Sequence, residues 1–257
     1  MNRELPIPDE LLLALEEDSR KGMRTILKQY NKKLKQKEAI NKQTEALRKK
    51  EKELYGAGYY AIAGVDEAGR GPLAGPVVAG AVIMKRNGAL LPVRDSKKLS
   101  HAKREALRQQ IKAEALAYAI GIASVREIEQ LNILEATKLA MKRALGNLRQ
   151  PFDYLLTDVV HLSQISCPQE NIVKGDEQVY AIAAASILAK EYRDELMQLY
   201  SRLYPAYGFH KNKGYGTATH LKAVKTYGLS PIHRRTFKGL GKNSVSEYKK
   251  RINLFRK

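Results

Sequence analysis

Residues 61–84 read AIAGVDEAGRGPLAGPVVAGAVIM, two apolar runs separated by the acidic pair Asp66 and Glu67 and a stretch of small residues and prolines. The second run is rich in β-branched residues, so the pattern predicts a strand, an acidic corner, a glycine turn and another strand. Consecutive strand side chains point to opposite faces, so both acids can reach one site only where the strand ends. We therefore expect the first strand to end at this pair.

Arg70 stands between Gly69 and Gly71, directly after the acidic pair. A cation between two glycines, whose backbone amides are unobstructed, forms a small anion-binding nest. Carboxylates beside an anion-binding group are typical of a site where a metal ion joins them. The alternative is an ordinary solvated strand end.

The glycines from Gly69 to Gly75 also resemble a dinucleotide-binding motif. That motif needs its last glycine inside the first turn of a helix, where the pyrophosphate binds. Pro76 and the β-branched residues after it favour a strand instead. The dinucleotide interpretation is therefore weak.

The composition is strongly basic, with 46 Lys and Arg against 27 Asp and Glu and a formal charge of +19. Such an excess indicates a polyanionic partner, with nucleic acid first and an anionic membrane surface well behind. No apolar run approaches the ~20 residues of a membrane span, and no signal-peptide pattern opens the chain. Cys167 is the single cysteine and cannot form an intramolecular disulfide, which favours a cytoplasmic protein.

The chain divides at the Gly-Ala-Gly sequence of residues 56–58. Residues 1–57 are rich in Lys, Gln, Glu and Leu and predict a basic helical N-terminal extension of one or two helices. This segment is either a solvated or partly disordered arm or an additional contact to nucleic acid. We expect residues 58–257 to form the main domain, including a helical C-terminal region and a basic tail.

Asp158 ends a second apolar strand, predicted over residues 152–157, and so repeats the arrangement at Asp66. Ligands are held at strand ends in a sheet flanked by helices. A short strand follows at residues 172–173, and the chain then turns at Lys174, Gly175 and Asp176 into a long helix over residues 177–204. By itself, Asp176 is equally well explained as a helix cap.

Two basic segments are candidates for nucleic-acid contact. Lys97 and Lys98 precede a helix predicted over residues 101–113 and either hold phosphates or belong to an ordinary basic loop. Residues 207–217 interleave aromatic and basic side chains, including Tyr215, a composition that suits a nucleic-acid backbone.

Six blocks of the sequence occur in one order between residues 62 and 239: GVDEAGRGPLAGPVV, DSKKLS, LNILEATKLAM, KGD followed by IAAASILAK, KGYGT and HRRTF. Together they resemble bacterial ribonuclease HII, the type 2 ribonuclease H. Arg70 and Pro72 favour this type over ribonuclease HIII. The resemblance implies a ribonuclease H-like α/β fold with a central mixed five-stranded sheet flanked by helices, between a helical N-terminal extension and a helical C-terminal part.

The resemblance also implies site residues. The catalytic and metal-binding carboxylates fall on Asp66, Glu67, Asp158 and Asp176, with two Mg²⁺ or Mn²⁺ ions in the catalytic complex. Cations resolve the mutual repulsion of four gathered carboxylates, and hard oxygen ligands suit these two metals.

The residues expected to contact substrate are Gly69, Arg70, Gly71, Lys97, Lys98 and Tyr215. We assign Tyr215 and the glycine–arginine–glycine element to sensing the 2′-hydroxyl that separates RNA from DNA. One departure from the family pattern is Asn212, where a histidine is common.

The implied activity is two-metal hydrolysis of the RNA strand in RNA–DNA hybrids and incision 5′ of single ribonucleotides in DNA, giving 5′-phosphate and 3′-hydroxyl ends. Such a monomeric enzyme would serve ribonucleotide excision repair and RNA primer removal. A hybrid-binding protein without activity would need no set of four carboxylates. A resolvase or integrase on the same fold would lack the KGYGT and IAAASILAK blocks.

Overall fold

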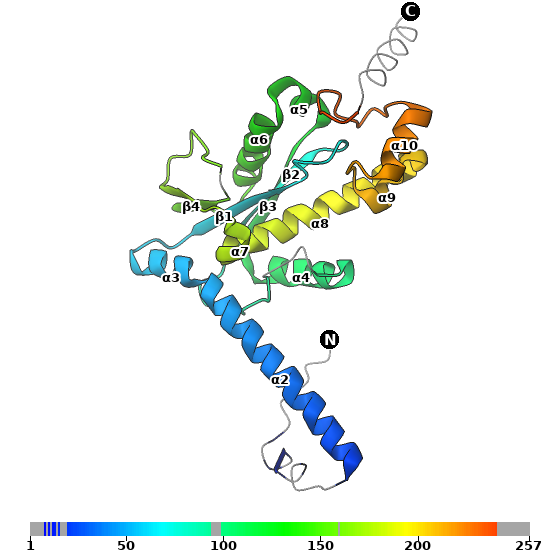
Figure 1. Cartoon of the computed structure of the whole chain (residues 1–257). Helices are drawn as coiled ribbons and strands as arrows, with labels where there is room; N and C mark the ends of the chain where they lie inside the picture. The colour runs from blue at the N-terminus through cyan, green and yellow to red at the C-terminus, as the bar shows by residue number, and fades with distance from the viewer. Residues whose placement is uncertain are drawn as a thin grey trace, which may run out of the picture.

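The structure is a computed structural model that describes residues 20–93, 99–158 and 160–240, and positions 8, 10, 12, 13 and 15 (Figure 1). Lys97 and Lys98 lie outside the described residues, so their expected phosphate contacts stay predictions.

A mixed five-stranded sheet forms the centre of the molecule, as expected. Its order is β3-β2-β1-β4-β5, from β1 (Ile62–Ala68), β2 (Val77–Met84), β3 (Ala115–Ala123), β4 (Tyr154–Thr157) and β5 (Gln169–Asn171). The first three strands form an antiparallel meander, and β4 and β5 continue the sheet in parallel with β1. The chain passes from β1 to its parallel neighbour β4 through β2, β3 and the helices around them, whereas β4 and β5 are joined by residues 158–168, in which the described residues form no helix.

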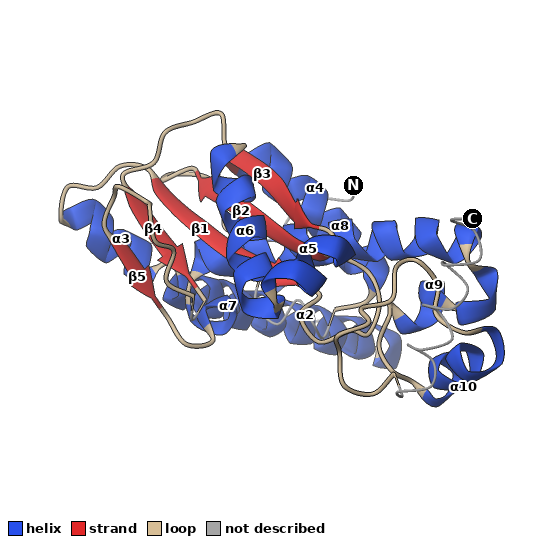
Figure 2. Ribbon diagram, turned by 90° about the horizontal axis from the view of Figure 1, so that it is seen from above, coloured by secondary structure: helices blue, strands red, loops and turns tan. Residues whose placement is uncertain are grey.

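The helices lie on both faces of the sheet, with further ones at the two ends of the chain (Figure 2). They are α2 (Lys21–Leu47), α3 (Lys49–Gly56), α4 (His101–Glu114), α5 (Val125–Leu131), α6 (Ile133–Gly146), α7 (Gly175–Gln178), α8 (Tyr180–Leu203), the 3₁₀ turn η2 (Pro205–Tyr207), α9 (Phe209–Asn212) and α10 (Ala218–Tyr227).

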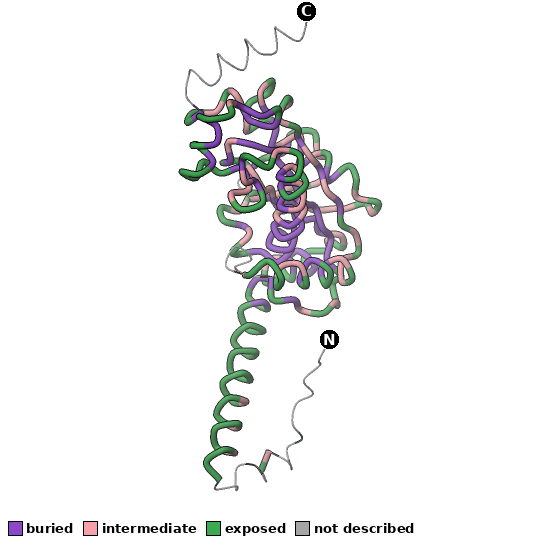
Figure 3. Tube along the Cα trace, turned by 90° about the vertical axis from the view of Figure 1, so that its right-hand side faces the viewer, coloured by how far each residue is buried: buried purple, intermediate pink, exposed green. Residues whose placement is uncertain are grey.

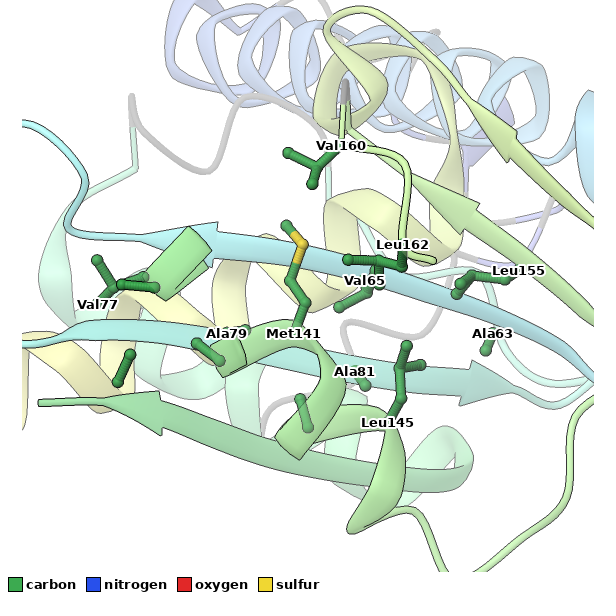
Figure 4. Packing of buried hydrophobic residues seen from close by; sticks show 14 of the residues in the cluster. Ala63, Val65, Val77, Ala79, Ala81, Met141, Leu145, Leu155, Val160 and Leu162 are labelled. Carbon is green, nitrogen blue, oxygen red and sulfur yellow. The ribbon is translucent and has the colours of Figure 1, made fainter. Parts of the chain in front are cut away.

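Strand alternation assigns the two faces to different helices. Ala63, Val65 and Ala81 pack with Met141 of α6 in one buried cluster (Figure 4). The alternate positions face α8, where a Cβ added to Gly64 would lie 2.6 Å from the Cβ of Ala181. Because the strand has glycine where the helix has alanine, α8 approaches the sheet closely, as its small-residue run predicts.

Three local expectations are wrong. β1 does not end at the acidic pair, because β2 continues to pair with it as far as Ala68. The last strand is Gln169–Asn171 rather than residues 172–173, since the pairing with β4 fixes its position. The long helix is broken at Val179, whose extended backbone (φ −130°, ψ 128°) separates α7 from α8.

The C-terminal half of α8 packs with η2, α9 and α10 around a second buried cluster that includes Met197, Tyr207, Phe209 and Val224. Ala74 from the β1–β2 loop is fully buried in the same cluster. This apolar contact joins the C-terminal helices to the loop that follows the acidic pair.

The helix α2 projects from the body of the protein and is exposed along nearly its whole length (Figure 3). Only Thr44 and Leu47, near its C-terminal end, are buried. The helix contains eight Lys and Arg and two Glu, so the prediction of a basic helical surface is confirmed. No helix within the described ranges is long and apolar enough to cross a bilayer.

The short helix α3 fastens this N-terminal segment to the body. Glu51, 3% exposed, accepts a hydrogen bond of 2.8 Å from the backbone N–H of Ala181 in the first turn of α8. The Arg48 guanidinium donates to the carbonyls of Lys85 and Arg86 just after β2. A carboxylate at a helix N-terminus interacts favourably with the helix dipole.

Replacing Glu51 with Gln will flatten the pH dependence of stability. Burial raises the pKa of the Glu51 carboxyl from 4.5 to about 7. The folded state therefore binds more protons than the unfolded chain between these values, and stability falls as the pH rises through that window. Gln keeps the hydrogen-bond acceptor but cannot ionise, so this fall, on the order of 3 kcal/mol, should disappear.

Urea unfolding at about pH 5 and about pH 8 measures the effect. Glu53→Gln is the matched control, because Glu53 lies on the same helix with its side chain 54% exposed, near Lys49. An identical pH dependence in wild type and Glu51→Gln would contradict the prediction.

Candidate active site

The sheet brings two of the predicted carboxylates to one level. β1 and β4 are parallel neighbours in a register that pairs Val65 with Thr157, and Asp66 and Asp158 are the next residues along each strand. Asp66 is 5% exposed, whereas Asp158 is partly buried. Adjacent parallel strands therefore present two acids at the same edge of the sheet.

The segment that carries Asp176 lies against Asp158. The backbone N–H of Gly175 donates to Asp158 Oδ1 at 3.3 Å. A Cβ on Gly175 would lie 2.6 Å from the terminal methyl of Ile182, so glycine allows this approach without a shift of that side chain. Lys174 precedes it in the left-handed region with φ 55°, which turns the chain so that Asp176 stands in the first turn of α7.

All four carboxylates interact electrostatically. Burial raises the pKa of the Asp66 carboxyl well above its ordinary value, and the negative charge of Glu67 raises it further. The charges of Asp158 and Asp176 act in the same direction. Like charges at close range disfavour ionisation, so the three neighbouring carboxylates make Asp66 harder to ionise.

Glu67 shows where a cation would bind. Its Oε1 accepts a hydrogen bond from Arg70 Nη1 at 3.0 Å, and its side chain is 10% exposed. Its Oε2 is buried and has no hydrogen-bond partner among the described residues. A buried carboxylate oxygen without a partner is costly, and a metal ion would satisfy it.

The donor set fits a hard divalent cation, because carboxylate oxygens are the ligands that Mg²⁺ and Mn²⁺ prefer. In the described part of the chain, however, no three Asp, Glu, His or Cys side chains are gathered closely enough to hold a metal ion. The four acids are near enough to repel one another but are not arranged as a closed coordination shell. Binding a metal would thus require the side chains to move inward.

The loop after β1 is fixed by two buried arginines. Arg234, fully buried, donates to the backbone carbonyls of Gly69, Arg70 and Gly75. Arg234 belongs to the HRRTF block, whose sequence alone gives no sign that it supports the glycine loop.

Arg193 supports the same loop from α8. Its guanidinium, 2% exposed, donates to the carbonyls of Ala74 and Pro76 at 3.1 Å and to Lys213 at 3.0 Å. It thereby ties the β1–β2 loop to the segment that precedes Tyr215. The periodicity of α8 predicted a packed helix but gave no sign of this contact.

Tyr215 lies beside the glycine–arginine–glycine element. A Cβ added to Gly71 would be 3.7 Å from the Tyr215 ring, and the N–H of Leu73 donates to the carbonyl of Gly214 at 2.8 Å. The Tyr215 residue is 52% exposed. Since Arg70 contacts Glu67, the glycine loop connects the carboxylate cluster to this exposed aromatic ring.

Asn212, at the position where histidine is common, has a structural part in the turn before Tyr215. Its side-chain amide donates to the carbonyl of Tyr207 at 2.7 Å, and its Oδ1 accepts from the N–H of Gly214 at 2.8 Å. The residue therefore holds the turn through its amide.

The family model described as Ribonuclease HII matches residues 63–240. This chain belongs to the ribonuclease HII family. A second model, Ribonuclease HII N-terminal domain, matches residues 4–55, so the N-terminal segment also has counterparts in the family. The resemblance stated from the sequence blocks is confirmed.

Relatives and solved structures agree with this assignment. The ribonuclease HII of Desulfitobacterium hafniense is 50% identical over 229 residues, covering 89% of this chain and 88% of its own. That of Enterococcus faecalis is 48% identical, covering 89% of each chain. The crystal structure of ribonuclease H2 from Pyrococcus horikoshii superposes with a TM-score of 0.63 at 25% identity, covering 74% of this chain and 99% of its own.

A ribonuclease HIII solved in complex with Mn²⁺ is 19% identical and has a TM-score of 0.57, covering 74% of this chain and 70% of its own, which shows the same fold. The predicted ribonuclease H-like fold is therefore confirmed. As a member of the ribonuclease HII family, the protein is an endonuclease, a hydrolase that acts on the RNA of RNA–DNA hybrids.

Proposed function

We propose that this ribonuclease also cuts on the 5′ side of single ribonucleotides embedded in DNA, leaving 5′-phosphate and 3′-hydroxyl ends. We further propose that Asp66, Glu67, Asp158 and Asp176 form its catalytic centre. The observation that carries the assignment is the placement of Asp66 and Asp158 at one level on adjacent parallel strands, with the Asp176 segment bonded to Asp158 through Gly175 and a buried Glu67 Oε2 that has no hydrogen-bond partner among the described residues.

The four carboxylates would hold two Mg²⁺ or Mn²⁺ ions, which when bound supply a lowered pKa for the attacking water and charge stabilisation at the leaving 3′ oxygen. Asp66 supplies a buried ligand. Glu67 supplies the Oε2 that lacks a partner. Asp158 receives the N–H of Gly175, and this contact holds the Asp176 segment close to β4.

Arg70 would bind the phosphate next to the scissile bond. Its side chain is 43% exposed and contacts Glu67 Oε1 at 3.0 Å in the free protein. Arginine binds phosphate oxygens in a bidentate manner, so a phosphate can compete with Glu67 for it. Release of Glu67 from Arg70 would free its second oxygen at the moment that substrate arrives.

Tyr215 and the backbone of Gly69, Arg70 and Gly71 would recognise the 2′-hydroxyl. The ring is exposed and lies next to Gly71, where a sugar could contact both. An aromatic ring stacks on a sugar or base, and the phenol can donate or accept a hydrogen bond. Lys97 and Lys98 would add phosphate contacts.

Further parts of the proposal rest on the sequence. The excess of positive charge supports a nucleic-acid partner, and the single Cys167 supports a reducing cytoplasm as the place of action. We propose a monomer made of a basic extension, residues 1–57, and a catalytic domain, residues 58–257. Its place would be in the removal of misincorporated ribonucleotides and RNA primers.

Cleavage of a labelled DNA duplex with one ribonucleotide tests the proposed function. We expect cutting on the 5′ side of the ribonucleotide with Mn²⁺ or Mg²⁺, and no cutting with EDTA or in an all-DNA duplex of the same sequence. Cutting only in long hybrids would refute the single-ribonucleotide activity. Binding of the duplex without cleavage under either metal would favour a hybrid-binding protein instead.

A further inference from the structure

Two histidines form a buried pair behind the Tyr215 loop. His220 of α10 and His233 of the C-terminal segment are 0% and 1% exposed. Their Nε2 atoms lie 3.0 Å apart, and the rings of Tyr207 and Phe209 pack against both. Two buried imidazoles in direct contact need a defined arrangement of protons.

The partners of the pair determine that arrangement. At one end, the backbone N–H of Ser230 donates to His233 Nδ1 at 2.9 Å, so this nitrogen must be unprotonated. The Ser230 hydroxyl lies 2.8 Å from the same nitrogen. At the other end, His220 Nδ1 lies 2.8 Å from the carbonyl oxygen of Tyr215, which can only accept, so this nitrogen carries a proton.

Only one neutral pair of tautomers satisfies both ends. His233 carries its proton on Nε2 and donates it to the unprotonated Nε2 of His220, which in turn donates from Nδ1 to Tyr215. Burial lowers the pKa of both imidazoles, to about 4 for His233, and this keeps the pair neutral. A directional chain of hydrogen bonds thus runs from Ser230 to the backbone of Tyr215.

We propose that His220 and His233 are positioning residues for substrate recognition: they fix the Tyr215 carbonyl and so hold its ring against Gly71. The Tyr215 ring is itself half exposed, and its own N–H bonds to the carbonyl of Asn212. The Tyr215 carbonyl accepts from the N–H of Thr217 at 2.8 Å and from His220 Nδ1 at 2.8 Å, so the histidine pair adds a side-chain donor to a backbone one on this side of the residue. This inference rests on the proposed role of Tyr215 in reading the ribonucleotide.

Two amide substitutions at His220 distinguish its hydrogen bond to Tyr215 from its hydrogen bond to His233. Asn places its amide near the position of Nδ1 and can still donate to Tyr215. Gln reaches the position of Nε2 and still accepts from His233, but it removes the donor from His220 to the Tyr215 carbonyl, which still accepts from the N–H of Thr217 at 2.8 Å. We expect His220→Gln to lower kcat/KM at a single ribonucleotide about tenfold, the size of one hydrogen bond, and His220→Asn to stay within about twofold of wild type.

A double-substitution cycle with Tyr215→Ala distinguishes positioning from a general structural role. Without the ring there is nothing to position, so His220→Gln should have no further effect on kcat/KM in that background. If His220→Gln lowers kcat/KM equally in both backgrounds, the histidine pair is merely structural and the proposal is wrong.

The cleavage rates distinguish a failure of the role proposed for Tyr215 from a failure of the positioning role proposed for the histidine pair. If Tyr215→Ala cleaves like wild type, the role proposed for Tyr215 is wrong and the positioning proposal falls with it. If Tyr215→Ala is impaired and His220→Gln is not, only the positioning proposal falls.

A measurement on the unaltered protein keeps the inference testable if a variant fails to fold. NMR of protein labelled with ¹⁵N at histidine reports which ring nitrogen carries the proton. We expect His220 protonated on Nδ1 and His233 on Nε2 at neutral pH. The opposite tautomers, or a charged pair, would overturn the proposal independently of any activity.

Discussion

Asp66→Asn will abolish cleavage of an RNA–DNA hybrid and, in the absence of metal, make the protein more stable. Asp66 is the most buried of the four acids, and the negative charges of Glu67, Asp158 and Asp176 repel its own. Asn keeps the shape but removes the negative charge that would hold a divalent cation. We expect a rate loss of on the order of a thousandfold or more, as when a group that stabilises developing charge is removed.

The gain in stability follows from the sign of the pKa shift. The pKa of the Asp66 carboxyl is raised in the folded protein, so the protein loses stability as the pH rises through that value and this buried acid ionises. Asn cannot ionise and avoids the loss at neutral pH. Active sites commonly have this opposition between stability and activity.

Thermal unfolding with and without Mn²⁺, beside cleavage rates, measures both effects. Metal should raise the melting temperature of wild type, because a ligand that binds the folded state stabilises it, and should raise that of Asp66→Asn much less. If Mn²⁺ raised the melting temperatures of wild type and Asp66→Asn equally, Asp66 would not be a metal ligand.

Asp153 provides the matched control. It lies at the opposite end of the β4 segment and accepts hydrogen bonds from the N–H groups of Tyr60 and Ala61. Asp153→Asn should therefore give the reverse pattern, with cleavage near that of wild type and a modest loss of stability.

Arg234→Ala will destabilise the protein strongly and impair cleavage, although Arg234 lies outside the carboxylate cluster. Its removal leaves the carbonyls of Gly69, Arg70 and Gly75 without their donor. A buried polar group left unsatisfied costs about 1–3 kcal/mol, so the total is on the order of 3 kcal/mol or more. Because that is a large part of the stability of a typical domain, we expect low yield and early melting.

Arg234→Lys tests whether the shape of the guanidinium is needed. Lysine keeps a charge but has a single nitrogen that cannot reach three carbonyls in a fork. We expect it to fold, to be intermediate in urea unfolding, and to cleave more slowly because the loop that carries Arg70 and Gly71 is less fixed. Arg235→Ala is the control, since Arg235 is one-third exposed at its side chain and pairs with Glu129 at 3.1 Å.

A single ion pair between partly exposed side chains contributes little, about 1 kcal/mol, so Arg235→Ala should unfold closer to wild type than Arg234→Ala does. If Arg234→Lys matched wild type in both stability and cleavage, the hydrogen bonds from the guanidinium to the glycine loop would contribute to neither, and the prediction would be wrong.

The sequence by itself was enough to predict the family and, through that resemblance, the mixed sheet, and its strand-end patterns pointed to Asp66, Glu67 and Asp158 as candidate site residues. Apolar runs that end in Asp158, or that meet an acidic pair, are local patterns, since strand periodicity and turn residues act over a few positions. The small-residue run of α8 likewise predicted close packing, which the contact between Gly64 and Ala181 bears out.

Only the tertiary structure decided how the site is held. β1 extends past Glu67 because its partner strand continues, and the buried Arg234 reaches carbonyls up to 165 residues earlier in the chain. The pairing of His220 with His233 likewise joins a helix to a separate segment. Such contacts form between parts of the chain brought together by packing, and no periodicity or motif spacing within one segment specifies them.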